Sequence, residues 1–425
     1  GARVIGFSTH TTSYLVSLEV ARRIKARDAS RVVLFGGPQC ARSQAARRFA
    51  EEPCVDAVVV GEGEETLAEI LRGGLKPMPG LVLRWEGRVL DCGGREPLLD
   101  LDSLPLPDYS DFAEDMRAGR YNSPARLDIF ESRGCVRSCH FCSEWQFWQR
   151  FRTMSGERVF REVVEQIRLY PQVEHFYFVG SLLNGHLRTL EDFCDRVLAA
   201  GLRIRWEGQA IVSPRMDEAM LRKMAQAGCV WLGFGIESGS ERVRAAMNKR
   251  FTNEEALLTL KAAHAAGIRS QINIMFGLPT ETRADFTETL AFLRRCRPYI
   301  DSVLASQSFT VLDKGTELHA HPERFGIAGQ DHHLFWSSNN GENDYPERFR
   351  RYEEFCRLAL ELGLPETSGV LRRKPDKWQL LGDYYQHLGR PARAAACLRR
   401  SLREESRNRT VEEKLERALA QAASA

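Results

Sequence analysis

Apolar residues in the first part of the chain gather in short runs that are separated by segments with helical spacing. The runs at 3–8, 31–35 and 55–60 predict three buried strands, because each is short, apolar and followed by glycine or polar residues. Residues 14–25 repeat apolar positions every three or four residues, which predicts a helix. Strands that alternate with helices are typical of a parallel sheet, so we predict an α/β domain over residues 1–75.

A second alternation of strands and helices fills the middle of the chain. Residues 76–124 are rich in proline, glycine and aspartate, which predicts a linker with a small hairpin at 81–90. Residues 125–312 alternate again and predict an open or closed α/β barrel, whose active site would lie at the carboxyl ends of its strands. The six predicted strands are 127–132, 175–179, 203–207, 231–236, 270–275 and 302–309.

The alternation ends after residue 312. Residues 313–345 are polar and irregular, and we expect them to cap the barrel mouth. Residues 346–425 return to helical spacing and predict an α-helical C-terminal domain. One hairpin there resembles a single tetratricopeptide repeat through Trp378, Leu381, Gly382, Tyr385, Ala394 and Leu398. Because at least three such repeats are needed for a free-standing stack, a structural role is favoured over peptide binding.

Composition narrows the classes of partner. A chain of 425 residues is longer than one hydrophobic core ordinarily supports, so we expect two or three domains. Its 60 basic and 57 acidic residues leave a net charge of only +3. That balance gives no electrostatic reason to expect nucleic acid, so we predict a small-molecule substrate. No apolar run is long enough to span a bilayer, and the first residues lack a secretory signal, so we expect a cytoplasmic monomer without a membrane partner. The eleven cysteines fit reduced thiols.

Three cysteines follow the first predicted barrel strand. Cys135, Cys139 and Cys142 have the i, i+4, i+7 spacing, and thiolates are the soft ligands that iron–sulfur clusters use. Three protein ligands to a four-iron cluster would leave one iron open. Two alternatives remain: an apolar stripe of a helix, although the intervening residues are poor helix formers, and a zinc site with His140 as fourth ligand.

Glycines directly follow two strands of the predicted first domain. Gly36 and Gly37 precede Pro38, and residues 61–64 read Gly-Glu-Gly-Glu. Glycine after a parallel strand lets a ligand approach the backbone at the carboxyl edge of the sheet. Alone this signal is weak, because many α/β domains bind nothing there.

The cysteine spacing, with Phe141 before the last cysteine, resembles the signature of the radical S-adenosylmethionine (SAM) superfamily. Segments 235–240 and 276–282 are similar to family segments that border SAM, and 36–38, 61–66 and 100–105 are similar to its cobalamin-binding branch, the class B-type methyltransferases. The resemblance covers about residues 3–310. It implies a partial Rossmann-like cobalamin-binding domain, then a radical-SAM (β/α)6 partial barrel.

The resemblance also implies cofactors and the residues that hold them. Cys135, Cys139 and Cys142 would bind a [4Fe–4S] cluster, and a reduced flavodoxin or ferredoxin-type protein would supply electrons. SAM would contact Phe141, Gly180, Ser181, Gln209, Glu237, Ser238, Met275, Gly277 and Leu278. Cobalamin would contact Thr9, Thr11, Thr12, Tyr14, Gly36, Gly37, Pro38, Gly61, Glu62, Gly63 and Glu64. No Asp-x-His-x-x-Gly motif occurs, so we expect cobalt without a histidine lower ligand.

The chain departs from the family pattern at positions that border SAM. Gly180 and Ser181 stand where an acidic pair is common, and Ala210 stands where an arginine is common. The tryptophan C2-methyltransferases of thiopeptide biosynthesis handle SAM atypically, moving its methyl group without the usual radical step. We expect a similar departure here, with Glu237 or Glu207 as the catalytic carboxylate near the open iron.

An aromatic stretch at 145–151 follows the cysteines. Trp145 and Trp148 predict a pocket for a flat substrate. The alternative, which is favoured because aromatic residues dominate ordinary cores, is packing of the cysteine loop against the barrel. The expected function is transfer of a methyl group from SAM, via methylcobalamin, to a carbon of a small molecule in natural product biosynthesis, with C2 of tryptophan as the preferred acceptor. Two other functions stay open: ring formation or rearrangement by a radical SAM enzyme, with or without cobalamin, and an iron–sulfur or zinc module that binds a partner through its helical tail.

Overall fold

The computed structural model describes residues 2–10, 13–41, 43–118, 120, 126–306, 309–329, 332–365, 376–404 and 408–423. The chain forms two compact units, and each has its own sheet and hydrophobic core. The first unit comprises Gly1–Pro105, Arg133–Cys135 and Glu144–Arg152, and the second comprises Leu106–Ser132, Val136–Ser143 and Thr153–Ala425.

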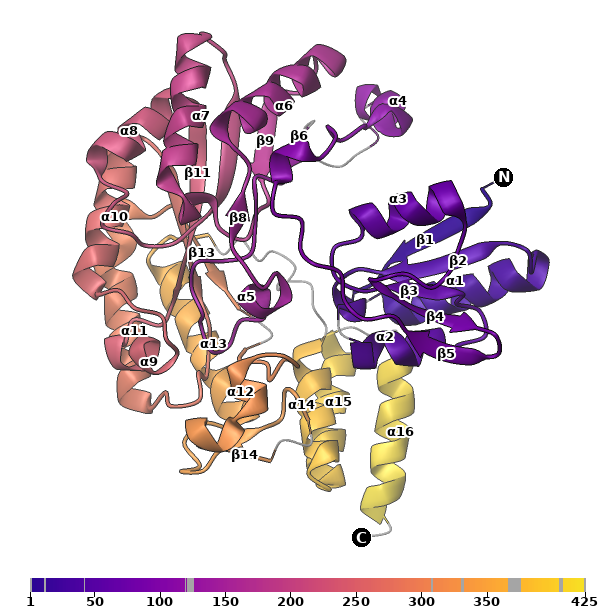
Figure 1. Cartoon of the computed structure of the whole chain (residues 1–425). Coiled ribbons are helices and arrows are strands. Elements are labelled where there is room, and N and C mark those ends of the chain that lie inside the picture. Colours follow the sequence, from indigo (N-terminus) through magenta and orange to yellow (C-terminus); the bar gives the residue numbers. More distant parts are fainter. Residues whose placement is uncertain are drawn as a thin grey trace. The chain divides into compact units, whose positions relative to one another are not determined.

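The first unit contains a five-stranded sheet in the order β1-β2-β3-β4-β5 (Figure 1). Its strands are β1 (Val4–Ser8), β2 (Val32–Gly36), β3 (Ala57–Val59), β4 (Leu81–Trp85) and β5 (Arg88–Asp91). The first three are parallel, as predicted, and the predicted hairpin forms β4 and β5. The hairpin extends this sheet, because β4 pairs antiparallel with β3. The first unit therefore continues past residue 75, to Pro105.

Helices cover both faces of the first sheet. They are α1 (Tyr14–Arg27), α2 (Ser43–Ala50) and α3 (Glu64–Gly73). Leu18 of α1 and Phe49 of α2 pack with Phe35 of β2 in one buried cluster. Ile70 of α3 packs with Leu34, the neighbouring residue of β2, in another. Because successive strand side chains point to opposite faces, the continuous apolar run of β2 serves both clusters.

The second unit is organised around a six-stranded, entirely parallel sheet in the order β13-β12-β11-β10-β9-β6. Its strands are β6 (Arg126–Ile129), β9 (His175–Phe178), β10 (Arg205–Ala210), β11 (Cys229–Glu237), β12 (Arg269–Ile274) and β13 (Ser302–Ala305). The helices between them are α6 (Gly156–Leu169), α7 (Leu187–Ala199), α8 (Glu218–Gln226), α9 (Glu241–Ala246), α10 (Asn253–Ala265) and α11 (Arg283–Cys296). Figure 1 shows α7, α8 and α10 along one side of this sheet. The predicted α/β alternation is confirmed, and the sheet is an open, partial barrel in the described part of the chain.

The two faces of this sheet differ in polarity. Trp206 of β10 is fully buried on the helix side, where its ring packs against Phe178 and Phe193. Its neighbours Glu207 and Gln209 point to the other face, as the two-residue period of a strand requires. The face of the sheet away from these helices, which we call the inner face, therefore carries polar side chains that are only partly buried.

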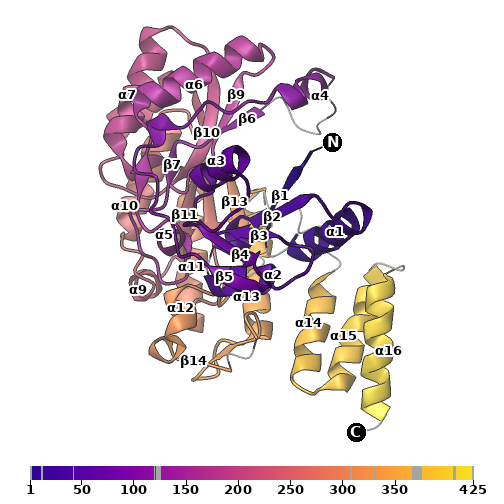
Figure 2. The same cartoon turned by 45° about the vertical axis from the view of Figure 1, so that its right-hand side comes forward.

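An irregular segment and a helical tail complete the second unit. The irregular segment contains α12 (Glu317–Ala320), β14 (Ile327–Ala328) and β15 (Ser337–Ser338), and α13 (Tyr345–Glu361) follows it. The tail consists of α14 (Asp376–His387), α15 (Pro391–Glu404) and α16 (Arg409–Ala423), side by side in Figure 2. The predicted helical hairpin is α14 and α15, which approach closely: a Cβ on Gly382 would lie 2.8 Å from Leu398. No helix within the described ranges is long and apolar enough to cross a membrane.

Candidate functional site

The cysteine loop follows β6 and the short strand β7 (Ser132–Arg133). Cys139 is 8% exposed, and Cys135 and Cys142 are half-buried. His140 fixes the later part of the loop: its N–H donates to the carbonyl of Met247 at 3.0 Å, and its ring Nδ1 lies 3.1 Å from the carbonyl of Ala246. The last residue of α9 and the residue after it therefore hold the segment that carries Cys139 and Cys142.

The donor set of this loop fits an iron–sulfur cluster. Thiolates are soft ligands, and in a cubane cluster each binds a different iron, so they need not converge on one point. No three His, Cys, Asp or Glu side chains of the described residues converge to hold a single metal ion. Three thiolates would leave one iron of a four-iron cluster without a protein ligand.

Glu237 ends β11 beside the segment that carries Cys139. Its carboxylate accepts a hydrogen bond from Nζ of Lys249 at 3.1 Å, and both side chains are nearly buried. Burial alone would lower the pKa of Lys249, but the charges of Glu237 and Cys139 outweigh burial and raise the pKa. Nζ of Lys249 also lies 5.8 Å from the ring centre of Phe141, so the predicted SAM residues Phe141 and Glu237 share one basic neighbour.

A buried carboxyl group lies against Gly180. Glu131, between β6 and β7, accepts hydrogen bonds from the backbone N–H of Gly180 at 3.1 Å and from the hydroxyl of Ser132 at 3.2 Å. A Cβ at position 180 would overlap this carboxyl group. Burial raises the pKa of Glu131 to about 7. Gly180 and Ser181 stand where family members commonly carry an acidic pair, and here a carboxyl group from another part of the chain, that of Glu131, lies against Gly180.

The other predicted SAM residues divide into two groups. Gln209 faces the inner side of the sheet, where its amide bonds Tyr177 at 3.4 Å and Asn273 at 3.3 Å. Ser238 is fully buried, and its hydroxyl lies 3.2 Å from that of Thr289. Its backbone N–H donates to the carbonyl of Ile236 at 2.9 Å and its carbonyl accepts a hydrogen bond from Arg244, so its polar groups bond within the protein. Ser181 lies half-buried directly after Gly180.

The strand register separates the two predicted catalytic carboxylates. Glu207 pairs in register with Trp231, and Glu237 lies six residues further along β11, roughly 20 Å at 3.3 Å per residue. Glu207 is bound by Arg126 at 2.9 Å. Only one of the two carboxylates can therefore lie near a given iron, and their catalytic roles stay predictions.

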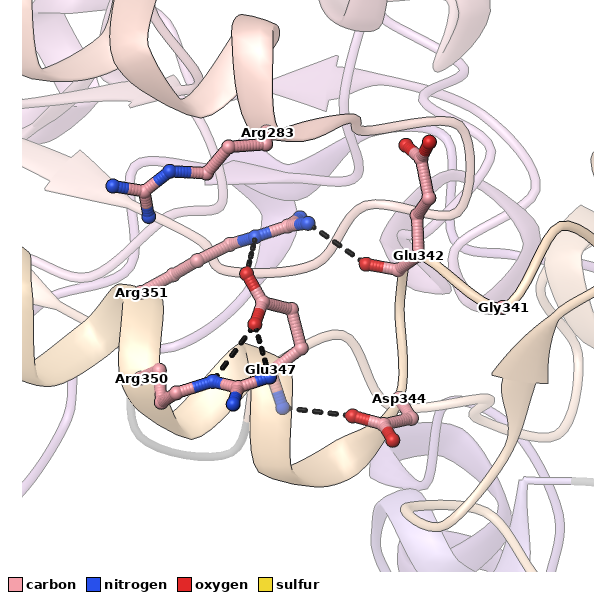
Figure 3. A pocket seen from close by; sticks show the side chains of 7 residues that line it. All are labelled: Arg283, Gly341, Glu342, Asp344, Glu347, Arg350 and Arg351. Atoms are coloured by element: carbon pink, nitrogen blue, oxygen red, sulfur yellow. Dashed lines mark hydrogen bonds and ion pairs between the residues drawn. The ribbon is translucent and has the colours of Figure 1, made fainter.

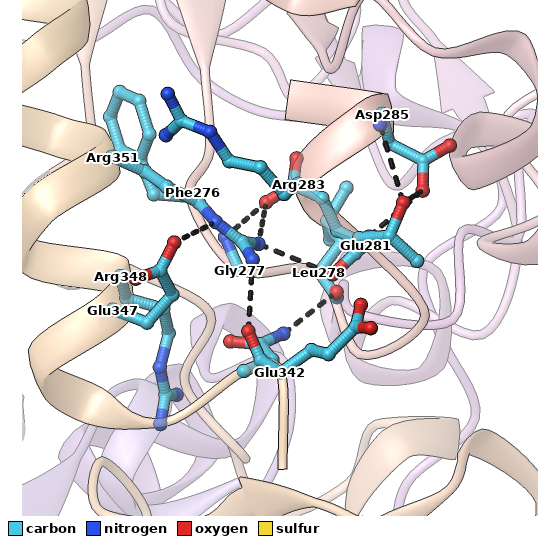
Figure 4. A network of polar contacts seen from close by, with 12 residues as sticks. Phe276, Gly277, Leu278, Glu281, Arg283, Asp285, Glu342, Glu347, Arg348 and Arg351 are labelled. Atoms are coloured by element: carbon cyan, nitrogen blue, oxygen red, sulfur yellow. Dashed lines mark hydrogen bonds and ion pairs between the residues drawn. The ribbon is translucent and has the colours of Figure 1, made fainter. Parts of the chain in front are cut away.

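The loop after β12 is held by a buried ion pair with α13 (Figure 4). The backbone N–H of Gly277 donates to Glu281 at 2.9 Å, and Arg351 donates to the same carboxylate at 2.9 Å. Arg351 also donates to the carbonyl of Glu342 at 2.9 Å. Leu278 is buried in one cluster with residues of the irregular segment, and Met275 packs against it. The loop that carries Gly277 and Leu278 is thus fixed from α13 and from the irregular segment.

A charged surface pocket of about 530 Å³ lies beside this ion pair (Figure 3). Its acidic and basic side chains largely neutralise one another, because Glu347 accepts hydrogen bonds from both Arg350 and Arg351. Arg283, at its rim, is paired with Glu354 at 2.7 Å. Four of the six charged side chains that line the pocket are thus ion paired.

The carboxyl edge of the first sheet fits a large flat ligand. Thr9 is buried and its hydroxyl donates to the carbonyl of Gly36 at 2.8 Å, which joins the ends of β1 and β2. Gly37 has a φ of +88°, and a Cβ there would lie 2.9 Å from the backbone nitrogen of Thr9. Beside Gly61, also at positive φ, there is open space. Gly37 therefore allows the ends of β1 and β2 to pack closely, and the open space beside Gly61 leaves the backbone there accessible to a ligand.

Three other predicted cobalamin residues also lie close to this edge. Tyr14 begins α1 and packs on Phe49, with ring centres 5.9 Å apart. Pro38 opens a short 3₁₀ turn after Gly37, and Gly63 directly precedes α3. Thr11 and Thr12 lie outside the described residues.

The acidic residues of this edge are ion paired within the first unit. The carboxylate of Glu62 binds Arg133 at 2.6 Å and also binds Arg152, and Arg133 binds Glu64 as well. The guanidinium of Arg133 lies 5.4 Å from the ring centre of Trp148, whose indole N–H donates to Glu144 at 3.1 Å. Trp148 therefore packs within the first unit. It directly follows the short helix α5 (Glu144–Phe147), in which Trp145 lies half-buried. Their role in binding a substrate stays a prediction.

Sequence reasoning missed the charged partners of the predicted residues: Lys249, Glu131, Arg133, Arg152 and Arg351. Each meets its partner across a separation that no local spacing encodes, apart from Lys249, which follows Glu237 by twelve residues. A local signal existed only for Arg133, which directly precedes the Gly-Cys of the cysteine motif.

Comparison with family models identifies both parts of this arrangement. Residues 130–293 match the radical SAM superfamily, and residues 1–71 match the B12 binding domain. The first match spans the cysteine loop, β9 to β12 and the loop that carries Gly277. The second spans the carboxyl edge of the first sheet with the glycines at 36–37 and 61–63, which we call the glycine edge.

Individual relatives agree with these matches. An uncharacterized methyltransferase of Pyrococcus horikoshii is 28% identical over 69% of this chain and 64% of its own length. The anaerobic magnesium-protoporphyrin IX monomethyl ester cyclase of Cereibacter sphaeroides is 23% identical over 56% of this chain and 40% of its own length. The chain thus spans less than two thirds of either relative.

A solved structure shows the same fold. The radical S-adenosylmethionine methyltransferase TsrM of Kitasatospora setae, with cobalamin and a [4Fe–4S] cluster bound, superposes with a TM-score of 0.61 at 16% identity, over 75% of this chain and 64% of that one. The two family matches, the glycine edge and the three thiols together imply a [4Fe–4S] cluster, SAM and cobalamin as cofactors. The chain therefore combines a B12 binding domain with a radical SAM domain.

Proposed function

We propose that this protein is a cobalamin-dependent methyltransferase that moves a methyl group from SAM to a carbon of a small-molecule substrate. One observation carries the proposal: a single chain combines a glycine edge suited to cobalamin with a loop of three thiolates suited to a cluster that has an open iron. The name of the Pyrococcus relative supports methyl transfer. The cofactors supply the methyl and electron chemistry, and the protein supplies binding and orientation.

Within this proposal, the residues of the chain have defined tasks. Cys135, Cys139 and Cys142 hold the cluster. Glu237 and Lys249 present one carboxylate and one ammonium beside the loop, a pair that complements the amino and carboxylate groups of SAM. Arg351 keeps the loop of Gly277 in place through Glu281.

We further propose that SAM serves as a methyl donor without release of 5′-deoxyadenosine. Ala210 stands where relatives commonly carry an arginine, and Gly180 lacks a carboxylate of its own. Glu131 fills the space beside Gly180, with a carboxyl group whose pKa of about 7 leaves it largely uncharged below neutral pH. The electrostatics of this position therefore differ from those of an ionised acidic pair. Stoichiometric 5′-deoxyadenosine alongside methylated product would contradict this second proposal.

Tryptophan, methylated at C2, is the first substrate to test. The protein is reconstituted anaerobically with iron, sulfide and cobalamin and incubated with a reductant, methyl-labelled SAM and candidate small molecules. We expect the label in one product, and none from a variant in which Cys135, Cys139 and Cys142 are all alanine. Cys92→Ala is the matched control, because this thiol lies outside the loop. Absence of label from every product would overturn methyl transfer.

Ring formation is the second candidate, and the cyclase of Cereibacter sphaeroides favours it. The same incubation distinguishes the two reactions. A product that loses two hydrogens and carries no label would support ring formation, whereas a labelled product heavier by one methylene supports methyl transfer.

A further inference from the structure

Two arginines at the base of the cysteine loop converge on one carboxylate of the glycine edge. Arg133 lies two residues before Cys135, and Arg152 lies in β8 (Arg152–Thr153), which pairs with β7. The pairing brings both guanidinium groups to Glu62, the second residue of the Gly-Glu-Gly-Glu segment after β3. The glycine edge and the start of the cysteine loop are thus joined within the first unit.

The burial of this contact separates it from an ordinary surface ion pair. The side chains of Glu62, Arg133 and Arg152 are 12%, 13% and 6% exposed. Burial opposes ionisation of Glu62, but hydrogen bonds and charges from Arg152 and Arg133 lower its pKa, so it is a carboxylate at neutral pH. Breaking ion pairs between a nearly buried carboxylate and two arginines is strongly destabilising, because removing any one of the three side chains leaves a buried charge without its partner.

Other contacts fix the backbone at the start of the cysteine loop relative to the two arginines. Arg152 also donates to the carbonyl of Leu98 at 2.6 Å and to that of Trp148 at 3.3 Å. Gly134, at a φ of +82°, packs so closely that a Cβ would lie 2.6 Å from the carbonyl oxygen of Arg150. Cys135 therefore follows a segment with little conformational freedom, and its position depends on where Glu62 holds that segment.

We propose that Glu62 is a positioning residue that couples the two cofactor sites, so that the cluster and cobalamin each strengthen binding of the other. Cobalamin bound along the glycine edge orders residues 61–64. Once Glu62 is fixed, its ion pairs fix the side chains of Arg133 and Arg152, and these fix the backbone that leads to Cys135. Coupling between two sites is reciprocal, so the cluster improves cobalamin binding by the same factor. This inference rests on the binding of both cofactors and not on the identity of the substrate.

The experiment measures cobalamin affinity by absorbance titration with hydroxocobalamin, in full-length protein with and without a reconstituted cluster. Wild-type protein should bind cobalamin at least about fivefold more tightly when the cluster is present, within the usual range of coupling. In Glu62→Gln the ratio of the two dissociation constants should fall to about one. Iron content and the electron paramagnetic resonance spectrum of the reduced cluster give readouts that do not depend on turnover.

Glu69→Gln is the matched control. Glu69 also pairs with an arginine of the first unit, Arg95, but its side chain is 46% exposed and it is not a predicted cobalamin contact, so the variant should keep the wild-type ratio. Arg152→Lys keeps the charge but loses the planar fork, so it should lower the ratio partly, and it also serves if Glu62→Gln fails to fold. Arg152→Met combined with Glu62→Gln should lose no more coupling than Glu62→Gln alone.

A merely structural role predicts a different pattern, because Glu62→Gln would then weaken cobalamin equally with and without the cluster. That result would overturn the proposal, and so would a wild-type ratio of one. If wild-type protein binds both cofactors but transfers no methyl group, the proposed function fails and the coupling still stands or falls on the ratio.

Discussion

At the scale of single residues, Glu237 combines an unfavourable backbone with a nearly buried charge. Its φ is +67°, in the left-handed region, and the register of β11 against β12 shifts just before it. Such a conformation costs of the order of 1–3 kcal/mol for a residue with a side chain and persists only where the surroundings enforce it. The ion pair with Lys249 is one such constraint, because both side chains of the pair are nearly buried.

The first prediction concerns this pair. Glu237→Gln should lower the free energy of unfolding by about 3 kcal/mol, because it leaves the buried ammonium of Lys249 without its counter-charge. Adding Lys249→Met should recover most of the loss, since no charge is then stranded. Urea denaturation measures both. Glu191→Gln, which breaks an exposed pair with Lys223, should change stability by less than about 0.5 kcal/mol. Equal losses in the single and double variants would contradict the prediction.

The second prediction concerns pH and Glu131. The unfolded carboxyl group releases its proton near pH 4.5, whereas the folded one keeps it until about pH 7, because burial raises its pKa. The folded state therefore binds more protons between these values, and stability must fall as pH rises through this window. Relative to Glu131→Gln, wild-type protein should lose about 3 kcal/mol from pH 4.5 to 7 and little more above.

Unfolding free energies of both proteins across this pH range test the second prediction. Glu218→Gln, at an exposed position, should show no such difference from wild type. A difference between wild type and Glu131→Gln that does not change with pH would show that the folded carboxyl group titrates normally.

Functional residues that form a local sequence motif could be predicted from the sequence, but the distant residues that contact them could not. Cys135, Cys139 and Cys142 are recognisable because their spacing lies within one loop. Glu131 meets Gly180 across 49 positions, and Glu62 meets Arg152 across 90. Such pairs depend on the path of the chain through the fold, which no local pattern encodes.

At the scale of elements, alternation of apolar residues locates strands well but does not give their pairing. All six strands of the second sheet were predicted, with ends that differ by a few residues. The hairpin β4–β5 was also predicted, but not its pairing with β3, because a hairpin's own sequence does not specify which strand lies beside it.

The third prediction concerns α13, which supports the loop of Gly277. Arg351→Met should lower the free energy of unfolding by about 3–5 kcal/mol and weaken SAM binding, because Glu281 then keeps a buried charge and loses the partner that orients it. Its neighbour Arg350→Met is the matched control. That side chain is 70% exposed and binds only Glu347 among the contacts described, so the change should stay within about 0.5 kcal/mol.

Calorimetric titration with SAM and denaturation curves test the third prediction. If both variants bind SAM alike, the ion pair does not position the loop. If Arg351→Met loses stability but keeps SAM affinity, the pair has a structural role only.

At the scale of the whole chain, the helical tail of the second unit has a small core of its own. The core consists mainly of alanine and leucine side chains: Ala394, Ala395, Leu398, Val411 and Ala418. So little apolar surface stabilises three helices only weakly. The tail gains further support from Tyr384 of α14, which stacks on Tyr345 of α13 at 5.7 Å and contacts Phe335 at 5.5 Å. A single hairpin of this kind needs such a neighbour, as the repeat pattern indicated.

The fourth prediction is that Tyr384 and Tyr345 are energetically coupled and that this coupling keeps the tail folded. Both rings are nearly buried, so each alanine substitution should cost several kcal/mol, and a double-mutant cycle should give a coupling of about 1 kcal/mol. Tyr385→Ala is the control, because Tyr385 packs in the tail's own core and its effect should add to that of Tyr345→Ala. Limited proteolysis should cut the tail of Tyr384→Ala before the barrel, because the tail then unfolds first. Additive effects of Tyr384→Ala and Tyr345→Ala, or simultaneous cleavage of tail and barrel, would mean that the tail is held by other contacts.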